Sequence, residues 1–178
     1  MPINRTGNPV AYTQGKTAFD VVHTRFGMQW GDNAAEAVTQ EFADVTLTSA
    51  QILALNATPV ELVPAPGAGR ALILEQALIF LNYNSAAYAG IAAGEDLAIR
   101  YTNGSGTILA TVETTGFLDQ TSSQFRIAYP YRAASGASDA TPTANAALVA
   151  HMTTGEVTTG NSPLFVKVFY RNIPTTLS

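Results

Sequence analysis

From Asp44 onward, short runs of alternating apolar and polar residues are separated by turns, and this pattern most constrains the fold. A period of two places successive side chains on opposite faces of a strand. The clearest example is a hairpin whose first strand carries Leu97, Ile99 and Tyr101 in one register. Its turn, residues 103–106, reads Asn-Gly-Ser-Gly, and Asn and Gly tolerate the positive φ of tight turns. The pattern predicts antiparallel strands.

About eight such strands are expected between Asp44 and the end of the chain. The run 70–83 is apolar in both registers, which is typical of a central strand covered on both faces, with an expected bulge at Glu75 and Gln76. Eight short strands predict an all-β fold, an antiparallel β-sandwich of jelly-roll type. An immunoglobulin-like sandwich is the alternative.

Residues 1–43 lack this periodicity and are expected to form an extended N-terminal arm, with 44–178 as the sandwich domain. The stretch 33–42 is compatible with a short helix. Disordered tails are usually short of aromatic residues, whereas this segment contains several, so we expect it to become ordered against a partner. The candidate partner-binding residues are Tyr12, Phe19, Phe26 and Trp30.

Charged residues make up only 12% of the chain, against roughly 25% in an ordinary soluble domain. A surface poor in full charges loses little hydration energy when a partner covers it, and interface cores are depleted in Lys and Glu. The composition therefore favours a protein that packs against other chains over a robust monomer. The net charge of −4, with arginines spread along the chain, predicts no nucleic-acid partner.

The N-terminal residues contain no apolar core of signal-peptide length, and the longest apolar run, 77–81, is far too short to cross a bilayer. We therefore expect a soluble protein made in a cytoplasm, with no membrane partner. Cysteine is absent, so disulfides and thiolate ligands are excluded.

Motifs for chemistry are also missing. Neither His23 nor His151 has a partner at metal-ligand spacing, and no nucleophile elbow or phosphate-binding loop is present. We expect no enzymatic activity, no cofactor and no metal, and a surface or interface position for His151. A sandwich glycosidase, which needs two carboxylates, is the enzymatic alternative. Its candidate acids are Glu75, Glu95, Asp96 and Glu113.

The last strand carries its own interface candidates. Leu164, Val166, Val168 and Tyr170 are expected to face inward. The opposite register holds Phe165, Lys167, Phe169 and Arg171. Exposed phenylalanines beside cations favour a subunit interface, and the alternative is a solvated face on which cationic stems cover the rings. Arg100 and Arg126 are likewise expected to face outward, so Phe125 and Ile127, which alternate with Arg126, are expected to face inward.

Four segments resemble stretches that recur in structural proteins of tailed bacteriophages: 45–69 (VTLTSAQILALNATPVELVPAPGAG), 81–88 (LNYNSAAY), 97–104 and 162–171 (SPLFVKVFYR). The resemblance covers about residues 44–172 and is best for jelly-roll capsid cement, or decoration, proteins. It implies a structural virion protein on the capsid exterior, made in the host bacterial cytoplasm. It further implies a homotrimer that binds the major capsid protein across capsomer junctions.

A tail or head-fibre component that binds host carbohydrate is the alternative function. Sugar sites use aromatic faces beside amides, and the loop 82–88 offers Tyr83, Asn84 and Tyr88.

Overall fold

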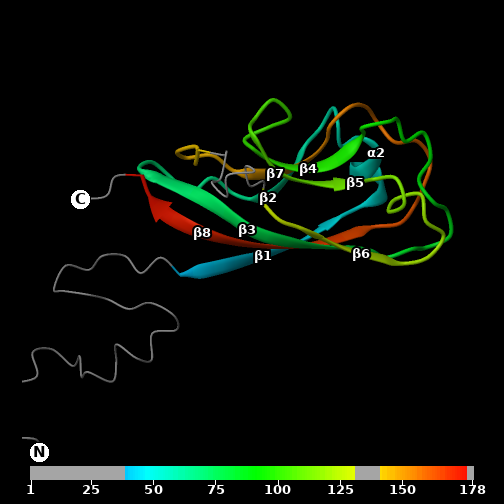
Figure 1. The fold of residues 1–178 in the computed structure, drawn as a ribbon, viewed down its shortest axis with the longest axis horizontal. Helices are drawn as coiled ribbons and strands as arrows, with labels where there is room; N and C mark the ends of the chain where they lie inside the picture. Colours follow the sequence, from blue (N-terminus) through cyan, green and yellow to red (C-terminus); the bar gives the residue numbers. More distant parts are fainter. Residues whose placement is uncertain (1–38, 131–140, 176–178) are drawn as a thin grey trace, which may run out of the picture. The chain divides into compact units, whose positions relative to one another are not determined.

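The computed structural model describes residues 39–130 and 141–175, which form an all-β domain (Figure 1). Its elements are β1 (Gln40–Leu47), α2 (Ser49–Leu53), β2 (Val60–Val63), β3 (Arg70–Leu81), β4 (Asp96–Tyr101), β5 (Ile108–Glu113), β6 (Gln124–Ala128), β7 (Leu148–Met152) and β8 (Leu164–Pro174). All pairings between these strands are antiparallel. No helix in the described ranges is long and apolar enough to span a membrane.

The strands form two sheets, with orders β1-β8-β3-β6 and β2-β7-β4-β5, which lie as two layers (Figure 1). The hydrophobic core lies between them, and its largest fully buried side chains include Leu72 and Ile79 from one sheet and Ile99 and Leu148 from the other. Each strand contributes alternate residues because successive side chains point to opposite faces. The expected jelly-roll-type sandwich of eight strands is confirmed.

The expected bulge in β3 is also confirmed. The register against β8 shifts between Leu74 and Gln76, which leaves Glu75 as the extra residue. A bulge turns the following side chains relative to the preceding ones. Beyond it, Leu78 and Phe80 point away from the core, whereas Ile79 remains buried.

The sandwich begins earlier than residue 44. Residues 40–43 form the first half of β1, where Gln40 pairs with Arg171 and Ala43 with Val168. Residues 40–42 of the expected helix are therefore extended, and 33–38 lie outside the described residues. The start of the strand was hard to see in the sequence because β1 is an edge strand whose first three residues are all exposed, so its inward register begins only at Ala43.

Strand β6 faces the opposite way from the expectation. Phe125 and Ile127 were expected inward, but they are 50% and 43% exposed, and Arg126 lies on the inner side. The Arg126 guanidinium donates to the Gly116 carbonyl and lies 5.2 Å from the centroid of the buried Phe117 ring. The prediction was wrong because β6 is an edge strand. The loop residue Phe117 fills the interior there, and the Arg126 stem can cover its ring.

Candidate functional site

The outer side of the sheet β1-β8-β3-β6 carries the exposed hydrophobic side chains of the domain. Among the described residues, six large hydrophobic side chains are 37% to 62% exposed, and all belong to this sheet or follow it directly: Phe42, Phe80, Phe125, Ile127, Tyr129 and Phe165. With the half-buried Phe169 they form what we call the aromatic face. Single exposed hydrophobic residues are ordinary, but a contiguous group on one face indicates an interaction surface.

Strand pairing arranges the aromatic face in rows. One row runs across three strands, because Phe165 pairs with Phe80 and Phe80 pairs with Phe125. The Phe80 and Phe165 rings stack with centroids 6.4 Å apart and planes 20° apart. A second row joins Phe42 to Phe169, whose ring centroids lie 6.3 Å apart. Stacked and tilted cross-strand pairs hold the rings in fixed positions before any partner arrives.

An ion pair lies between the two aromatic rows. Lys167 Nζ is 3.2 Å from Asp44 Oδ1 and 4.6 Å from the centroid of the Phe42 ring. Both charged side chains are more than a third exposed, so the pair contributes well under about 1 kcal/mol to folding. Its effect is instead to neutralise both charges within an apolar face. Across the sheet, Lys167 pairs with Leu78 and Leu78 pairs with Ile127, so the rest of this row is apolar.

A groove of about 290 Å³ opens on the aromatic face. It is lined by Asp44, Val45, Thr46, Leu78, Phe80, Phe125, Phe165, Val166 and Lys167. A hollow with mostly apolar walls is suited to a partner's hydrophobic side chain, because filling it releases water that the walls bind poorly.

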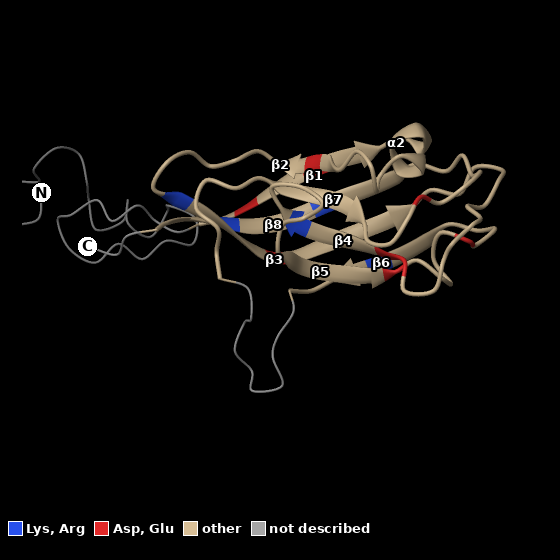
Figure 2. Ribbon diagram, turned by 90° about the horizontal axis from the view of Figure 1, so that it is seen from above, with Lys and Arg blue, Asp and Glu red and all other residues tan. Residues whose placement is uncertain are grey.

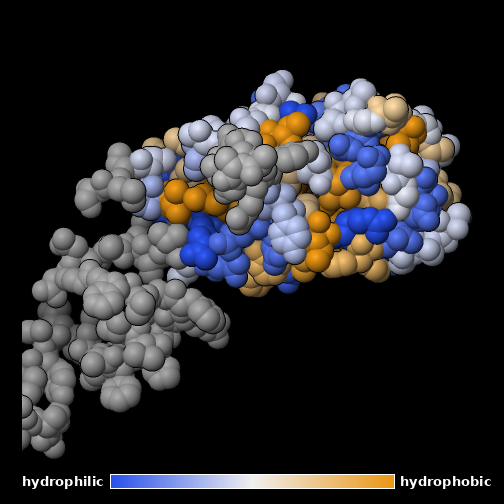
Figure 3. Space-filling view, in the orientation of Figure 1, coloured by the Kyte–Doolittle hydropathy of each residue, from blue (hydrophilic) through white to orange (hydrophobic). Residues whose placement is uncertain are grey.

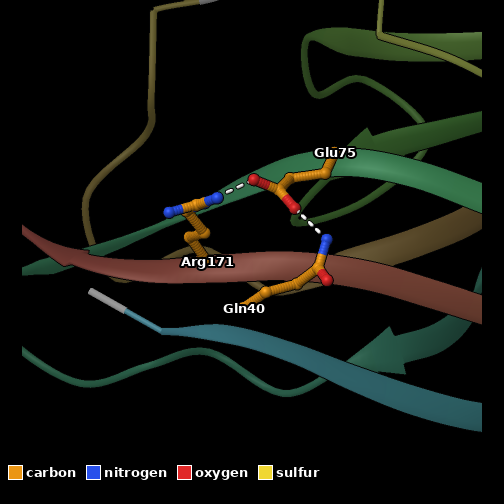
Figure 4. Close-up of polar contacts among 3 residues, drawn as sticks. All are labelled: Gln40, Glu75 and Arg171. Carbon is orange, nitrogen blue, oxygen red and sulfur yellow. Dashed lines mark hydrogen bonds and ion pairs between the residues drawn. The ribbon is translucent and has the colours of Figure 1, made fainter. Parts of the chain in front are cut away.

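Arg171 lies next to Phe169 in the outward register of β8, beyond the second aromatic row. The Glu75 carboxylate accepts hydrogen bonds from Arg171 Nε and from Gln40 Nε2 (Figure 4). Burial opposes ionisation of Glu75, but these hydrogen bonds and the charge of Arg171 outweigh it and hold the pKa of the carboxyl below its usual value. Glu75 is thus a structural carboxylate that ties three strands together.

The four expected subunit-interface residues therefore lie on one face. Phe165, Lys167, Phe169 and Arg171 alternate along β8, and Val166 and Val168 between them are buried. Sequence reasoning missed Phe42, Phe80, Phe125 and Ile127. The signal for β1 was present, since Phe42 alternates with Ala43, Val45 and Leu47 in the register of a half-buried strand.

The candidate acids of a glycosidase do not all meet at one place. Glu75 belongs to the sheet of β3, whereas Asp96 and Glu113 are a cross-strand pair between β4 and β5 in the other sheet. Burial and the Glu113 charge raise the pKa of Asp96. Glu95 is buried, and its Oε2 accepts a hydrogen bond from the Ala92 amide. Within the two described ranges, no group of three or more acidic or histidine side chains is placed to hold a metal ion.

The loop 82–88, the candidate sugar-binding loop, does not expose all of its aromatic side chains. Tyr88 is only 2% exposed, and its hydroxyl donates to the Ser162 carbonyl at 2.6 Å. Burial raises the pKa of Tyr88 well above its ordinary value. The backbone N–H of Asn84 donates to Ser162 Oγ, so the loop is held against the segment that precedes β8. Because the ring of Tyr88 is part of the core, it has no free face for stacking on a sugar.

His151 is buried rather than at the surface. Its side chain points away from the main core, as its register requires, but it is only 6% exposed. The turn after β4 covers it, since a Cβ on Gly104 would lie 2.5 Å from His151 Nε2. Burial and the nearby Arg100 lower the pKa of His151, and they outweigh a hydrogen bond from the imidazole to the backbone of Asn56 and the charge of Glu156, which raise it. Arg100 faces outward as expected and donates to the Gly106 carbonyl.

The replacement His151→Gln is expected to make the free energy of unfolding less dependent on pH between about pH 7 and pH 5. The lowered pKa keeps His151 neutral in the fold, while the unfolded chain binds a proton below the ordinary pKa of 6.5. Stability contributed at this position is therefore lost as the pH falls through that range. Urea titrations at several pH values measure the slope, and His23→Gln, at the other histidine, is the control. Equal slopes for wild type and His151→Gln would refute the assignment.

The four expected anchoring residues of the arm, Tyr12, Phe19, Phe26 and Trp30, lie outside the described residues. Their role stays a prediction.

Comparison with known proteins finds similar structures but no similar sequence. The sequence matches no family model and no curated protein. The fold is similar to a chain of the solved "Cyanophage Pam1 capsid asymmetric unit", at 14% identity and a TM-score of 0.44, covering 82% of this chain and 91% of that one. It is also similar to a chain of the "Capsid of Ralstonia phage GP4", at 14% identity and a TM-score of 0.44, covering 84% of this chain and 92% of that one.

Proposed function

We propose that this protein is a structural subunit of a bacteriophage virion, which stabilises the capsid as a cement, or decoration, protein. The observation that carries the proposal is the aromatic face, a rigid and exposed apolar surface with an internally neutralised ion pair. Patches of this kind mark interaction sites in soluble proteins. The resemblance of residues 44–172 to structural proteins of tailed phages supplies the class of assembly.

The distribution of charge supports the same function. Lys, Arg, Asp and Glu occupy few positions on the sandwich (Figure 2), and hydrophobic side chains reach the surface among hydrophilic ones (Figure 3). Covering such a surface costs little desolvation of full charges, so permanent contacts are favoured over transient ones.

The proposed mechanism is mechanical. A shell filled with DNA is under outward pressure, and a protein seated across capsomer junctions adds buried area to seams that would otherwise open. Apolar burial contributes about 25 cal/mol per Å² before ordering costs. In an oligomer, proposed as a homotrimer, several arms bind at once, so detachment requires several contacts to fail together. We assign contact with the major capsid protein to Tyr12, Phe19, Phe26 and Trp30.

Capsids that lack this protein test the proposal. Adding the purified chain is expected to raise the temperature at which filled capsids release their DNA, and the chain is expected to co-sediment with the shells at saturating stoichiometry. Electron microscopy of the same particles gives the position of each copy. Absence of the protein from the shells at saturating concentration, with unchanged DNA release, would contradict a cement function.

A further inference from the structure

We infer that the aromatic face docks against the aromatic face of a second copy, related by a two-fold axis that lies in the interface, parallel to the strands and over the boundary between β8 and β3. This two-fold pairing goes beyond the proposed function, because it is a contact separate from those that would join the three chains of the proposed homotrimer. It uses residues on all four strands of the sheet β1-β8-β3-β6, and it gives the unpartnered face a defined occupant.

The exposed apolar area is sufficient for a stable pair. At roughly 200 Å² per aromatic side chain, the exposed parts of Phe42, Phe80, Phe125, Ile127, Tyr129 and Phe165 offer about 600 Å². A standard interface covers about 800 Å² of each partner, of which about 60% is apolar. The aromatic face therefore supplies the apolar share of such an interface by itself.

The charges on the face suit a copy of the same face. Lys167 is neutralised by Asp44 and Arg171 is bonded to Glu75, so the face carries two acids and two bases in closed pairs. Two identical faces repel each other unless their charges balance, and here each cation enters the contact with its own counterion. A partner of strong net charge would find no complementary field on this surface.

The register of the strands makes the face complementary to itself. A two-fold rotation about this axis lays β1 over β6 of the second copy and β8 over β3, and each row of paired residues faces the same row of the second copy. It places Phe165 opposite Phe80 of the second copy, and Lys167 opposite Leu78. The two Lys167 side chains come to lie on either side of the axis. Sheets packed in this way bury interdigitated side chains in a layer about 10 Å thick.

Charge reversal on the face tests the pairing with the full chain. Asp44→Lys leaves two adjacent cations on the face, and Lys167→Asp leaves two adjacent anions, so each variant alone is expected to dimerise at least about tenfold more weakly than wild type. An equimolar mixture of the two variants is expected to form a heterodimer, because the opposite charges meet across the axis. The double variant Asp44→Lys/Lys167→Asp is expected to dimerise as wild type does. Sedimentation equilibrium over a concentration series measures all four.

Two further variants complete the design. Glu61→Lys changes the net charge as Asp44→Lys does but lies exposed on β2 in the other sheet, so it is expected to leave the dimer unchanged. Phe125→Ser removes an exposed ring from the edge of the face and is expected to weaken the dimer without a change in charge. Far-ultraviolet circular dichroism checks that each variant is folded.

The pairing is overturned if wild type is monomeric at all concentrations, if it is a trimer that charge reversal does not alter, or if the two reversed variants fail to associate when mixed. These measurements contain no capsid, so their failure leaves the capsid-binding test standing. Conversely, a heterodimer in solution together with no binding to shells would refute the cement function and keep the pairing.

Discussion

Gly160→Ala is expected to lower the free energy of unfolding by about 3 kcal/mol, which is a large share of the stability of a domain of this size. Gly160 has φ +90°, where an L residue is strained by about 1–2 kcal/mol. A Cβ there would also lie 2.4 Å from Cδ1 of Tyr88, well inside contact distance. The Tyr88 ring cannot move away easily, because it is buried and its hydroxyl is bonded to Ser162. Overpacking of such a site costs a further 1–3 kcal/mol or so.

Gly67→Ala is the matched control for this prediction. Gly67 has φ +97°, so the backbone strain is nearly the same, but a Cβ there meets no atom within 4 Å. We expect a loss of only about 1–2 kcal/mol. Urea denaturation of both variants isolates the clash with Tyr88 from the strain. Equal losses at the two positions would contradict the packing of Tyr88 beneath this turn, and would reopen the loop 82–88 as a possible binding surface.

Deletion of residues 1–38 is expected to abolish binding to capsids, by at least about 100-fold, while the sandwich stays folded. The reason for retained folding is that the buried core cluster extends from Leu47 to Val168 and β1 begins at Gln40. Binding is expected to be lost because the deletion removes the proposed anchors Phe19, Phe26 and Trp30. Every chain of the oligomer loses its arm, so the gain in affinity from several arms binding at once is lost as well. Co-sedimentation with shells and thermal unfolding measure the two effects.

The end point of this deletion matters. Cutting at residue 43, as the sequence pattern invites, would also remove Phe42 and half of the pairing between β1 and β8. A full-length variant with Phe19→Ala, Phe26→Ala and Trp30→Ala is the matched test, because it keeps the backbone of the arm. Capsid binding retained by both the deletion and the triple variant would contradict the anchor role of the arm.

Strands with one strongly apolar register were predictable. In β8, Val166 and Val168 are buried and Phe165 lies outward, as the alternation indicated. The bulge at Glu75 was also predictable, since two polar residues interrupt a run that is otherwise apolar. Interface candidates on β8 could therefore be named in advance.

Other features depend on what lies beside a strand. His151 has an outward register, yet the turn at Gly104 covers it. Tyr88 could not be placed from the sequence for the same reason: it lies in a loop, where an exposed ring is expected, but its side chain is part of the core. A loop contact between residues far apart in sequence leaves no periodic signal in either segment.

Local sequence alone determined that the chain folds into antiparallel strands, because a period of two and glycine-rich turns constrain each segment without reference to the others. Tertiary structure decided which side of each edge strand meets the core. In β6, both registers can cover apolar surface, Phe125 through its ring and Arg126 through its stem, and the position of Phe117 selects the second. That choice turns the phenylalanines of β6 outward and completes the aromatic face. Its existence is thus a property of how the strands are assembled, since burial depends on neighbours that only the folded chain brings together.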